Sequence, residues 1–344
     1  MRAFFSLTDG LGGAEQIIFN LARYYKQQNS NVIIFIFGKR TNTAWTDEFS
    51  HVHYAGGSFQ NLIRFVWNNT FKFVFSSHLM MNSFLGFFRT VGLLKTDELI
   101  CRESTLVFGR YSGTKLRRYK IAYWLGYRNI DLLITQTSAM EEGLKKQVPY
   151  LTERMKIKTI PNPFNFPAAE SVNSIVDVAE HSLVSAGRLI PEKGFDILIR
   201  TFAKILKSRP EMNLIILGEG GERSRLEALI SELKLENKVL LKGHVKNVYP
   251  YFKSAAICVV SSRREGFPNV LLQMMSQNTR VVSTLCAGDI ENIEGLFLAK
   301  TDDVESLYTA VDTCLKTDNS TNETLFSTDL KARSLESFVK KMTT

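Results

Sequence analysis

Short apolar runs without polar alternation recur along the chain, and they limit its fold more than any other feature. The run VIIFIF at residues 32–37 is typical, because a strand that is covered on both faces has no polar side. Segments with helical periodicity separate successive runs, and this alternation predicts a parallel, doubly wound α/β sheet. In the first half we expect strands at residues 2–7, 32–37, 71–76, 99–102, 132–135 and 156–160, and helices at 14–28 and 137–147.

A proline-rich linker interrupts this alternation. The sequence PNPFNFP at residues 161–167 has three prolines in seven positions. Each proline removes a backbone donor and restricts the residue before it, so the segment is expected to contain no helix or central strand. Beyond it we expect strands at residues 183–186, 214–217, 239–241, 257–260 and 280–283, and helices at 195–208, 222–233, 269–277 and 329–342.

Two α/β series joined by a linker predict two Rossmann-like domains that face each other across a ligand cleft, at the carboxyl ends of their strands. The length of 344 residues agrees, since a domain has about 150 residues. We expect an N-terminal domain at residues 1–165 and a second domain at 166–325. Residues 326–344 are expected to form a C-terminal helix that packs back toward the N-terminal domain.

Composition excludes several classes of protein. The chain is 44% hydrophobic and 22% charged, which is too apolar for disorder. No apolar run approaches the ~18 residues of a membrane-spanning helix, and the N-terminal segment predicts a strand rather than a secretory signal. The cysteines lack the spacing of a zinc site or a disulfide framework, so we expect buried, incidental thiols in a reducing cytosol. They are Cys101, Cys258, Cys286 and Cys314.

The excess positive charge lies in the first half of the chain. Residues 1–165 contain 21 Lys and Arg against 11 Asp and Glu, whereas residues 166–344 contain 22 against 23. In the densest part, residues 110–128, six cations are interleaved with five Tyr or Trp. Such a segment suits an anionic membrane surface, an anionic acceptor or nucleic acid, and equally a solvated helix face with its aromatic rings in the core. The candidate surface residues are Arg110, Lys115, Arg117, Arg118, Lys120 and Trp124.

Two junctions between a strand and a helix in the first half carry residues suited to a site. Gly12 and Gly13 follow the first strand, where glycines let the backbone approach a ligand and a helix N-terminus favours an anion. The segment is not G-x-G-x-x-G because position 15 is Glu, so a structural tight turn is as good an interpretation. His78 follows the strand at 71–76, where it would face the cleft or serve as a structural residue.

Two further junctions lie in the second half. The loop GRLIPEKG at 187–194 places Arg188 and Lys193 before a helix, where they suit a diphosphate or are solvated loop cations. The segment SRREGFPNVLLQ at 262–273 places Glu265 close to a helix N-terminus, as an acceptor of hydroxyl groups or a capping residue. The free N–H groups around residues 269–271 could bind phosphate oxygens, and Gln273 could bind a ribose diol.

These motifs occur in an order that resembles one family. GGAE, SAGRLIPEKGFDILI, ILGEGGE, LLKGHV and SSRREGFPNVLLQMMS together resemble the family-4 retaining glycosyltransferases of the GT-B fold. The resemblance is strongest over about residues 182–290 and is weaker, though collinear, across residues 1–165. The G-R-x4-K-G and E-G-F-P-N-V-L-L motifs at this spacing make it specific.

The resemblance implies a role for each matching residue. Arg188 and Lys193 match the pair that holds the donor diphosphate, and Glu265 matches the first Glu of the family's E-x7-E motif, which contacts the transferred sugar. His78 matches the residue at the acceptor side of that sugar. The residues to which the resemblance assigns catalytic roles are Arg188, Lys193, Glu265 and His78. The donor-binding residues that it implies are Gly12, Gly13, Arg188, Lys193, Gly218, His244, Val245, Glu265, Phe267, Asn269, Val270, Leu271 and Gln273.

The chain departs from the family pattern at two places. Gln273 stands where the pattern has its second Glu, the usual ribose ligand. A Gln still accepts a hydroxyl bond but loses the charge-assisted one, at a cost of roughly 1 kcal/mol. The usual C-G after that helix is replaced by Gln277 and Asn278. Activity is still expected, but the two departures leave the affinity for the donor open.

The resemblance implies transfer of a hexose or N-acetylhexosamine from a nucleotide diphosphate sugar, with retention of the α configuration. A UDP-sugar is the first expectation and GDP-mannose the second. The N-terminal domain would bind the acceptor and the second domain the donor. No D-x-D occurs in the chain, so we expect neither a metal nor another cofactor. The expected acceptor is a lipid-linked saccharide of bacterial O-antigen or capsule synthesis, with the enzyme peripheral on the cytoplasmic face of the membrane.

Three other classes stay open. A GT-B nucleotide-sugar epimerase or phosphorylase would use the same fold, but an epimerase needs more carboxylates in the cleft than Glu265 supplies. A non-catalytic glycosyltransferase partner is suggested by Gln273. A nucleic-acid binder would suit the basic segment at 110–128, although the sequence has no recognisable nucleic-acid module, and we expect no nucleic-acid partner.

Overall fold

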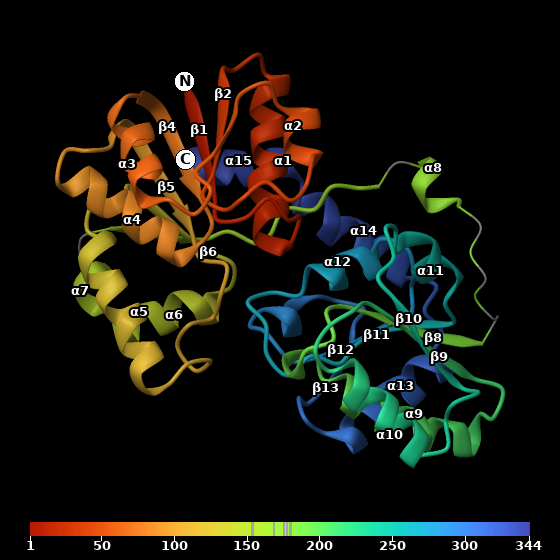
Figure 1. The fold of residues 1–344 in the computed structure, drawn as a ribbon. Coiled ribbons are helices and arrows are strands. Elements are labelled where there is room, and N and C mark those ends of the chain that lie inside the picture. Colours follow the sequence, from red (N-terminus) through yellow and green to blue (C-terminus); the bar gives the residue numbers. More distant parts are fainter. Residues whose placement is uncertain (153–154, 168, 175, 177, 179–180) are drawn as a thin grey trace. The chain divides into compact units, whose positions relative to one another are not determined.

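A computed structural model describes residues 1–152, 155–167, 169–174, 176, 178 and 181–344. The chain forms two compact units. The first unit is Met1–Pro163 with Leu335–Thr344, and the second unit is Phe164–Ser334 (Figure 1). Within the described residues, no helix combines the length and the apolar character that crossing a bilayer requires.

The first unit is built on a seven-stranded parallel sheet in the order β3-β2-β1-β4-β5-β6-β7. The strand order reverses between β1 and β4, as in doubly wound folds. The strands are β1 (Arg2–Ser6), β2 (Val32–Ile36), β3 (Val52–Tyr54), β4 (Thr70–Ser76), β5 (Lys95–Arg102), β6 (Leu132–Thr135) and β7 (Lys156–Thr159). The helices are α1 (Gly13–Gln27), α2 (Ala44–Glu48), α3 (Phe59–Trp67), α4 (Leu79–Thr90), α5 (Gly113–Gly126), α6 (Ser138–Gln147), α7 (Pro149–Thr152) and α15 (Leu335–Thr343).

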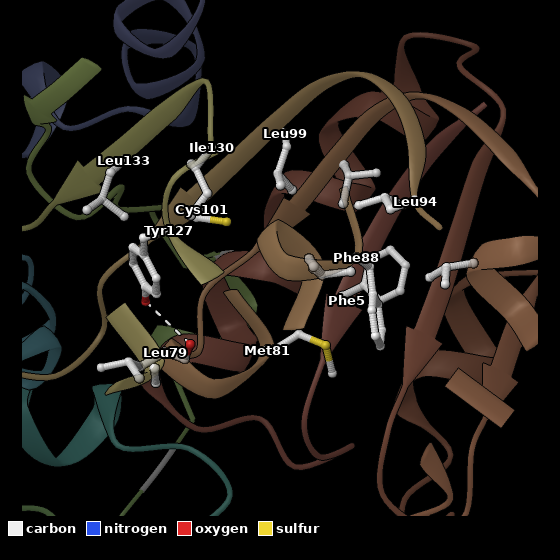
Figure 2. Packing of buried hydrophobic residues seen from close by; sticks show 14 of the residues in the cluster. Phe5, Leu79, Met81, Phe88, Leu94, Leu99, Cys101, Tyr127, Ile130 and Leu133 are labelled. Atoms are coloured by element: carbon white, nitrogen blue, oxygen red, sulfur yellow. Dashed lines mark hydrogen bonds between the residues drawn. The ribbon is translucent and has the colours of Figure 1, made fainter. Parts of the chain in front are cut away.

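Each face of this sheet has its own core. Phe5 packs with buried residues of α3, α4 and α5, whereas its neighbour Phe4 packs with residues of α1 and α15 on the other face (Figure 1). Figure 2 shows part of the first core, in which Leu79, Met81 and Phe88 of α4 meet strand residues such as Phe5. Burial on both faces explains why the strands show no polar alternation.

The second unit is built on a six-stranded parallel sheet in the order β10-β9-β8-β11-β12-β13. The order reverses between β8 and β11. The strands are β8 (Ser182–Ala186), β9 (Asn213–Leu217), β10 (Val239–Gly243), β11 (Ile257–Val260), β12 (Val281–Thr284) and β13 (Phe297–Ala299). The α-helices are α8 (Ala169–Val172), α9 (Phe195–Ser208), α10 (Arg223–Glu232), α11 (Tyr249–Ser254), α12 (Asn269–Met275), α13 (Val304–Lys316) and α14 (Asn322–Ala332), and two 3-10 turns are η1 (Pro191–Lys193) and η2 (Ile290–Asn292).

The predicted fold class, two doubly wound parallel α/β sheets, is confirmed. The expected strands occur with ends shifted by a few residues. Two strands were not predicted, β3 and β13, and each has three residues at an edge of its sheet. Runs this short carry no usable periodicity.

The expected single C-terminal helix is wrong. The segment forms two helices, α14 and α15, and residues 326–334 belong to the second unit. Phe326 of α14 is buried in the core of the second unit, whereas Phe338 of α15 is buried against α1 in the first. The boundary expected between residues 165 and 166 lies instead between residues 163 and 164. Phe164 packs in the core of the second unit, and its N–H donates to Arg333 O at 2.8 Å.

Close packing of α4 on α5 depends on Gly86. A Cβ atom at this position would overlap the carbonyl oxygen of Gly126, the last residue of α5. We therefore expect Gly86→Ala to destabilise the protein by about 1–3 kcal/mol, since overpacking displaces backbone that cannot give way. The measurement is the apparent Tm by scanning calorimetry, which should fall by several degrees.

Gly143→Ala is the matched control, because Gly143 lies inside α6 and a Cβ there meets only Phe108 Cδ2 at 4.0 Å. It should leave the Tm unchanged or raise it, since Ala favours a helix by up to about 1 kcal/mol over Gly. A Gly86→Ala protein as stable as the wild type would show that α4 and α5 pack less closely than described.

Candidate active site

The reversal of strand order in the second unit places two loops side by side. One follows β8 at residues 187–194, and the other follows β11 at residues 261–268. From these two loops the chain continues into helices on opposite faces of the sheet, because α9 packs in one core and α12 in the other. Open α/β sheets bind ligands at this position, outside the carboxyl ends of the strands.

An ion pair joins the two loops. Lys193 Nζ donates to Glu265 Oε1 at 2.5 Å, and Ser262 Oγ donates to the same oxygen at 2.7 Å. The two charged side chains are 19% and 16% exposed. The structure thus brings together two predicted site residues that are 72 positions apart, and it adds Ser262, which the sequence analysis did not single out.

Arg263 fixes the relative position of these loops. Its guanidinium donates two bonds of 2.8 Å to Asp196 and one of 2.7 Å to Pro191 O. A further bond of 2.5 Å goes to Asp302, before α13. Burial alone would raise the pKa of Asp196, but the hydrogen bond and charge of Arg263 outweigh it and lower that pKa. The loop that carries Glu265 is therefore anchored to three other segments.

Backbone contacts bring the loops closer still. Ser261 Oγ donates to Lys193 O at 3.0 Å, and the Arg263 N–H donates to Glu192 O at 2.8 Å. Gly194 has φ +62, and a Cβ there would overlap the carbonyl oxygen of Ser261. Only glycine tolerates both the conformation and the approach.

Arg188 differs from Lys193 although it is on the same loop. Its side chain is exposed, and it makes no hydrogen bond or ion pair with any residue that the structure describes. The loop therefore offers one cation that Glu265 already neutralises and a second whose charge is uncompensated.

The other predicted donor contacts divide into exposed and structural ones. His244 is exposed after β10, and Val245 is half-buried. Gly218 has φ +146, and a Cβ there would overlap Gly187 O, while its N–H donates to Gly243 O at 2.8 Å. Gly218 thus lets the loops after β8, β9 and β10 pack together.

Two residues at α12 that were expected to bind the donor make structural contacts. The Leu271 N–H donates to Pro268 O at 2.9 Å and is not free for a phosphate, and its side chain is fully buried. The Phe267 side chain is buried in the core, where the Arg333 guanidinium lies 5.1 Å from its ring centroid. Apolar side chains at these positions hold α12 on the sheet. Asn269 and Val270 stay partly exposed.

Gln273 lies one turn inside α12, which begins at Asn269. Its side chain forms a hydrogen bond with the hydroxyl of Tyr249. Burial raises the pKa of Tyr249, and this hydrogen bond opposes the rise. The sequence analysis missed Tyr249, since a Tyr in the short helix α11 carries no motif.

The first unit has a polar pair at its own strand reversal. His78, at the N-cap of α4, lies with Nε2 3.1 Å from Oε1 of Glu15 in the first turn of α1, and Thr8 Oγ1 donates to the same oxygen at 2.9 Å. Burial alone would raise the pKa of Glu15, but the hydrogen bond and charge of His78 outweigh it and lower that pKa. Gly12 and Gly13 stay exposed beside the pair.

Glu15 is the residue that sequence reasoning missed here. It was considered only as the position that breaks a glycine motif. Its place three residues after the N-cap Gly12 was the available signal, because a carboxylate in the first turn of a helix is stabilised and can accept from nearby groups.

The basic segment at 110–128 forms the loop before α5 and α5 itself. The cations Lys115, Arg117, Arg118 and Lys120 are exposed, as is Arg110 in the loop. The aromatic residues are divided: Tyr123 and Tyr127 are buried in the core, whereas Trp124 is 51% exposed with the Arg128 guanidinium 4.8 Å from its ring centroid.

All four cysteines are buried and free, as the prediction of incidental thiols requires. Burial, and next the charge of Glu265, raises the pKa of Cys286 to about 12. This thiol therefore stays protonated and unreactive beside the site.

Known proteins resemble this chain in sequence and in fold. Residues 180–317 match the family model Glycosyl transferases group 1. The matched residues lie within the second unit. The chain is 34% identical over 200 residues to the N-acetylgalactosamine-N,N'-diacetylbacillosaminyl-diphospho-undecaprenol 4-alpha-N-acetylgalactosaminyltransferase of Campylobacter jejuni, over 56% of this chain and 53% of that protein. It is 32% identical over 174 residues to the uncharacterized glycosyltransferase MJ1059 of Methanocaldococcus jannaschii, over 48% and 42%. It thus spans about half the length of these curated relatives.

Solved structures match the whole chain. Alr3699/HepE of Anabaena, crystallised in complex with UDP, has a TM-score of 0.80 at 18% identity and covers 100% of this chain and 98% of its own. WaaG, a glycosyltransferase involved in lipopolysaccharide biosynthesis, has a TM-score of 0.68 at 14% identity, with coverages of 97% and 95%. At such identities the likeness shows the fold, which is GT-B.

The Glu15–His78 pair should make stability depend on pH. Because the pKa of Glu15 is lowered in the folded state, its stabilising contribution is present above the ordinary Glu pKa of about 4.3 and is lost as the pH falls through the lowered value. We expect Glu15→Gln to lower the Tm at pH 7, and the difference from the wild type to shrink below about pH 4.3.

Differential scanning fluorimetry across this pH range measures the effect. Glu142→Gln, on the exposed face of α6, is the control and should track the wild type throughout. A difference between Glu15→Gln and the wild type that stays constant with pH would contradict the described pair.

Proposed function

We propose that this chain is a glycosyltransferase that moves a hexose or N-acetylhexosamine from a nucleotide diphosphate sugar to a sugar acceptor, with retention of the α configuration and without a metal. The observation that carries the proposal is the Lys193–Glu265 pair with Ser262, held at the strand reversal of the group 1 domain beside the uncompensated Arg188. A carboxylate and two cations at this place suit a sugar attached to a diphosphate.

The charges have separate tasks in this reaction. The C1–O bond to the phosphate breaks and leaves a nucleoside diphosphate, so negative charge grows on the phosphate oxygens. Arg188 presents a guanidinium fork to these oxygens. Lys193 has three N–H donors, so it can keep its bond to Glu265 and also donate to the phosphate. The carboxylate of Glu265 accepts hydroxyl groups of the transferred sugar.

The acceptor hydroxyl forms the new bond to C1. Its proton goes to the departing phosphate oxygen, which gains basicity as the C1–O bond breaks, so no separate base is needed. His78 is hydrogen-bonded to Glu15. Its proposed role is to shape the acceptor side of the first unit, not to accept the proton.

The donor that we propose is a UDP-sugar, with GDP-mannose as the second choice. Support comes from Alr3699/HepE, which has the same fold and was crystallised with UDP and with UDP-glucose. The exposed His244 and half-buried Val245 follow β10 and would meet the base.

The acceptor that we propose is a lipid-linked saccharide of bacterial surface polysaccharide, O-antigen or capsule, reached at the cytoplasmic face of the membrane. The Campylobacter relative is named for a diphospho-undecaprenol-linked saccharide, and Rhizobium LpsE, 29% identical over 165 residues, is named for lipopolysaccharide core biosynthesis. The exposed cations of α5 suit an anionic leaflet, where each gains about 1 kcal/mol.

A non-catalytic glycosyltransferase partner is the second candidate. The observation in its favour is Gln273, which replaces the expected carboxylate and bonds to Tyr249. Such a protein would bind a nucleotide weakly and would show no turnover, so kinetics separate the two candidates.

Loss of Lys193 or Arg188 should damage the enzyme most. We expect Lys193→Ala to lower kcat/KM by about 100-fold, or roughly 3 kcal/mol, because charge on the leaving group then develops beside an unpaired Glu265. Arg188→Ala should show a comparable loss. The assay follows nucleoside diphosphate release from candidate donors. Lys207→Ala, on the exposed end of α9, is the matched control and should keep wild-type turnover.

A thermal-shift panel with UDP, GDP, ADP and NAD tests binding independently of turnover. A ligand at 100 times its Kd stabilises the folded state by about 2.7 kcal/mol. We expect a shift with one nucleoside diphosphate that is lost in Lys193→Ala. Binding without turnover by any donor would support the non-catalytic partner, and no shift at all would overturn the proposed site.

Gln273→Glu tests the departure from the family pattern. If Gln273 faces the ribose, a carboxylate at this position gains a charge-assisted hydrogen bond of about 1 kcal/mol. Donor KM should therefore fall about fivefold with kcat nearly unchanged, because the ribose is remote from the reacting atoms. An unchanged KM would show that Gln273 serves only Tyr249.

A further inference from the structure

The helices on one face of the first unit expose apolar side chains to an unusual extent. Among the described residues, fifteen large hydrophobic side chains are exposed, and nine of them lie on or directly after α3, α4 and α5. These three helices cover the same face of the sheet, opposite α1 and α15 (Figure 1). The nine residues are Phe59, Ile63, Trp67, Met80, Phe87, Val91, Ile121, Trp124 and Leu125.

On α3 the exposed residues form a stripe along the helix. Phe59, Ile63 and Trp67 are 39–56% exposed and recur every fourth position, so they share one side of the helix. This stripe borders the buried side of the helix, because Leu62 and Val66 each lie three positions after a stripe residue. The apolar surface of α3 therefore continues from the core out to the solvent.

On α4 the usual polarity is inverted. Its polar residues Asn82 and Ser83 are buried, where they donate to Arg102 O at 3.1 Å and to Ala122 O at 2.8 Å. Its outer side instead carries Met80 and Phe87, followed by Val91, and these are 39–50% exposed. These hydrogen bonds explain why polar residues lie on the inner side of α4. They do not explain why its outer side is apolar.

The two stripes are neighbours. The rings of Phe59 on α3 and Phe84 on α4 are in edge contact, with centroids 4.6 Å apart. At the other end, Trp67 and Val91 immediately precede β4 and β5, which pair from Thr70 and Lys95 onward. We call the six exposed residues of α3 and α4 the apolar ridge: Phe59, Ile63, Trp67, Met80, Phe87 and Val91.

The helices of this layer themselves carry charge of one sign, although Arg89 of α4 forms an ion pair with the half-exposed Asp131 outside them. Residues 49–96, which contain α3 and α4, have four Lys or Arg and no Asp or Glu, and residues 104–130, which contain α5, have six and none. Lys95 Nζ lies 5.7 Å from the ring centroid of Trp67, and the Arg128 guanidinium lies 4.8 Å from that of Trp124. Cations over exposed Trp rings at the border of an apolar surface suit the headgroup zone of a bilayer.

We propose that the apolar ridge inserts into the anionic leaflet on which the basic α5 rests, so that the α3–α4–α5 layer docks on the membrane. The inference rests on the membrane setting of the proposed function but adds a new element, a hydrophobic contribution to binding from α3 and α4. A second copy of the chain fits the surface less well. A two-fold interface places the same patch on itself, and two layers without carboxylates would repel each other.

Vesicle flotation tests the ridge. Wild-type protein should float with phosphatidylcholine vesicles that contain about one quarter phosphatidylglycerol, at about 0.1 M and about 0.5 M NaCl, because insertion is not screened by salt. Ile63→Ser/Trp67→Ser/Phe87→Ser should bind at least about tenfold more weakly at high salt. Lys115→Gln/Arg117→Gln/Arg118→Gln should lose mainly the additional vesicle binding that the wild type shows at low salt. Leu240→Ser, an equally exposed Leu of the second unit, should bind as the wild type does.

Tryptophan fluorescence reports insertion directly. Trp45 is fully buried, while Trp67 and Trp124 are more than half exposed, so Trp124→Phe leaves Trp67 as the exposed reporter. Its emission should shift to the blue on these vesicles and be quenched by brominated lipids. Unchanged Trp67 emission in bound protein, or wild-type flotation by the ridge variant, would overturn the proposal.

Light scattering tests whether a second copy of the chain binds to the ridge. A wild-type dimer that becomes monomeric in the ridge variant, with vesicle binding unchanged, would assign the ridge to a second copy and overturn membrane docking. The UDP thermal shift of each variant shows that the second unit is intact. Insertion without glycosyl transfer would contradict only the proposed function, and transfer to a soluble acceptor without insertion would contradict only the ridge.

Discussion

The reversal of strand order within each sheet is the constraint on which both polar sites depend. At such a point the loops of two adjacent strands turn to opposite faces, which leaves the sheet edge between them open. In the second unit this brings Lys193 after β8 to Glu265 after β11, and in the first it brings Glu15 after β1 to His78 after β4. Each unit therefore pairs a carboxylate from one loop with a nitrogen from the other.

The Lys193–Glu265 pair is better understood as a positioning device than as a source of stability. Two partly buried charges at contact attract by ~4 kcal/mol at an effective dielectric of ~20, but desolvation of both ions offsets much of this. What the pair gains is a fixed geometry, because Arg263 anchors the same loop to Pro191, Asp196 and Asp302. Charges that are already oriented do not have to reorganise when a leaving group develops charge.

The sequence was sufficient for the α/β class and most strands, because apolar runs covered on both faces are a local signal. Lys193 and Glu265 were expected at one donor site through the family resemblance, and their direct contact comes from the structure. The sequence could not show Tyr249 or Glu15, because their roles depend on partners 24 and 63 positions away. It also did not show that the side chains of Phe267 and Leu271 are buried in the core. Within one motif, side chains that face the ligand alternate with side chains that pack on the core. The sequence pattern does not distinguish the two kinds.

The helix α4 was missed for a reason that bears on its function. Sequence reasoning finds a helix by contrast between an apolar and a polar side, and α4 carries its polar Asn82 and Ser83 inward while Met80 and Phe87 face outward. The periodic signal is thereby lost. In an aqueous protein such an inversion favours self-association, and the absence of carboxylates from α3 and α4 opposes pairing of like surfaces. An apolar surface with an excess of positive charge is therefore suited to a partner that is both apolar and anionic, which describes a leaflet with acidic headgroups.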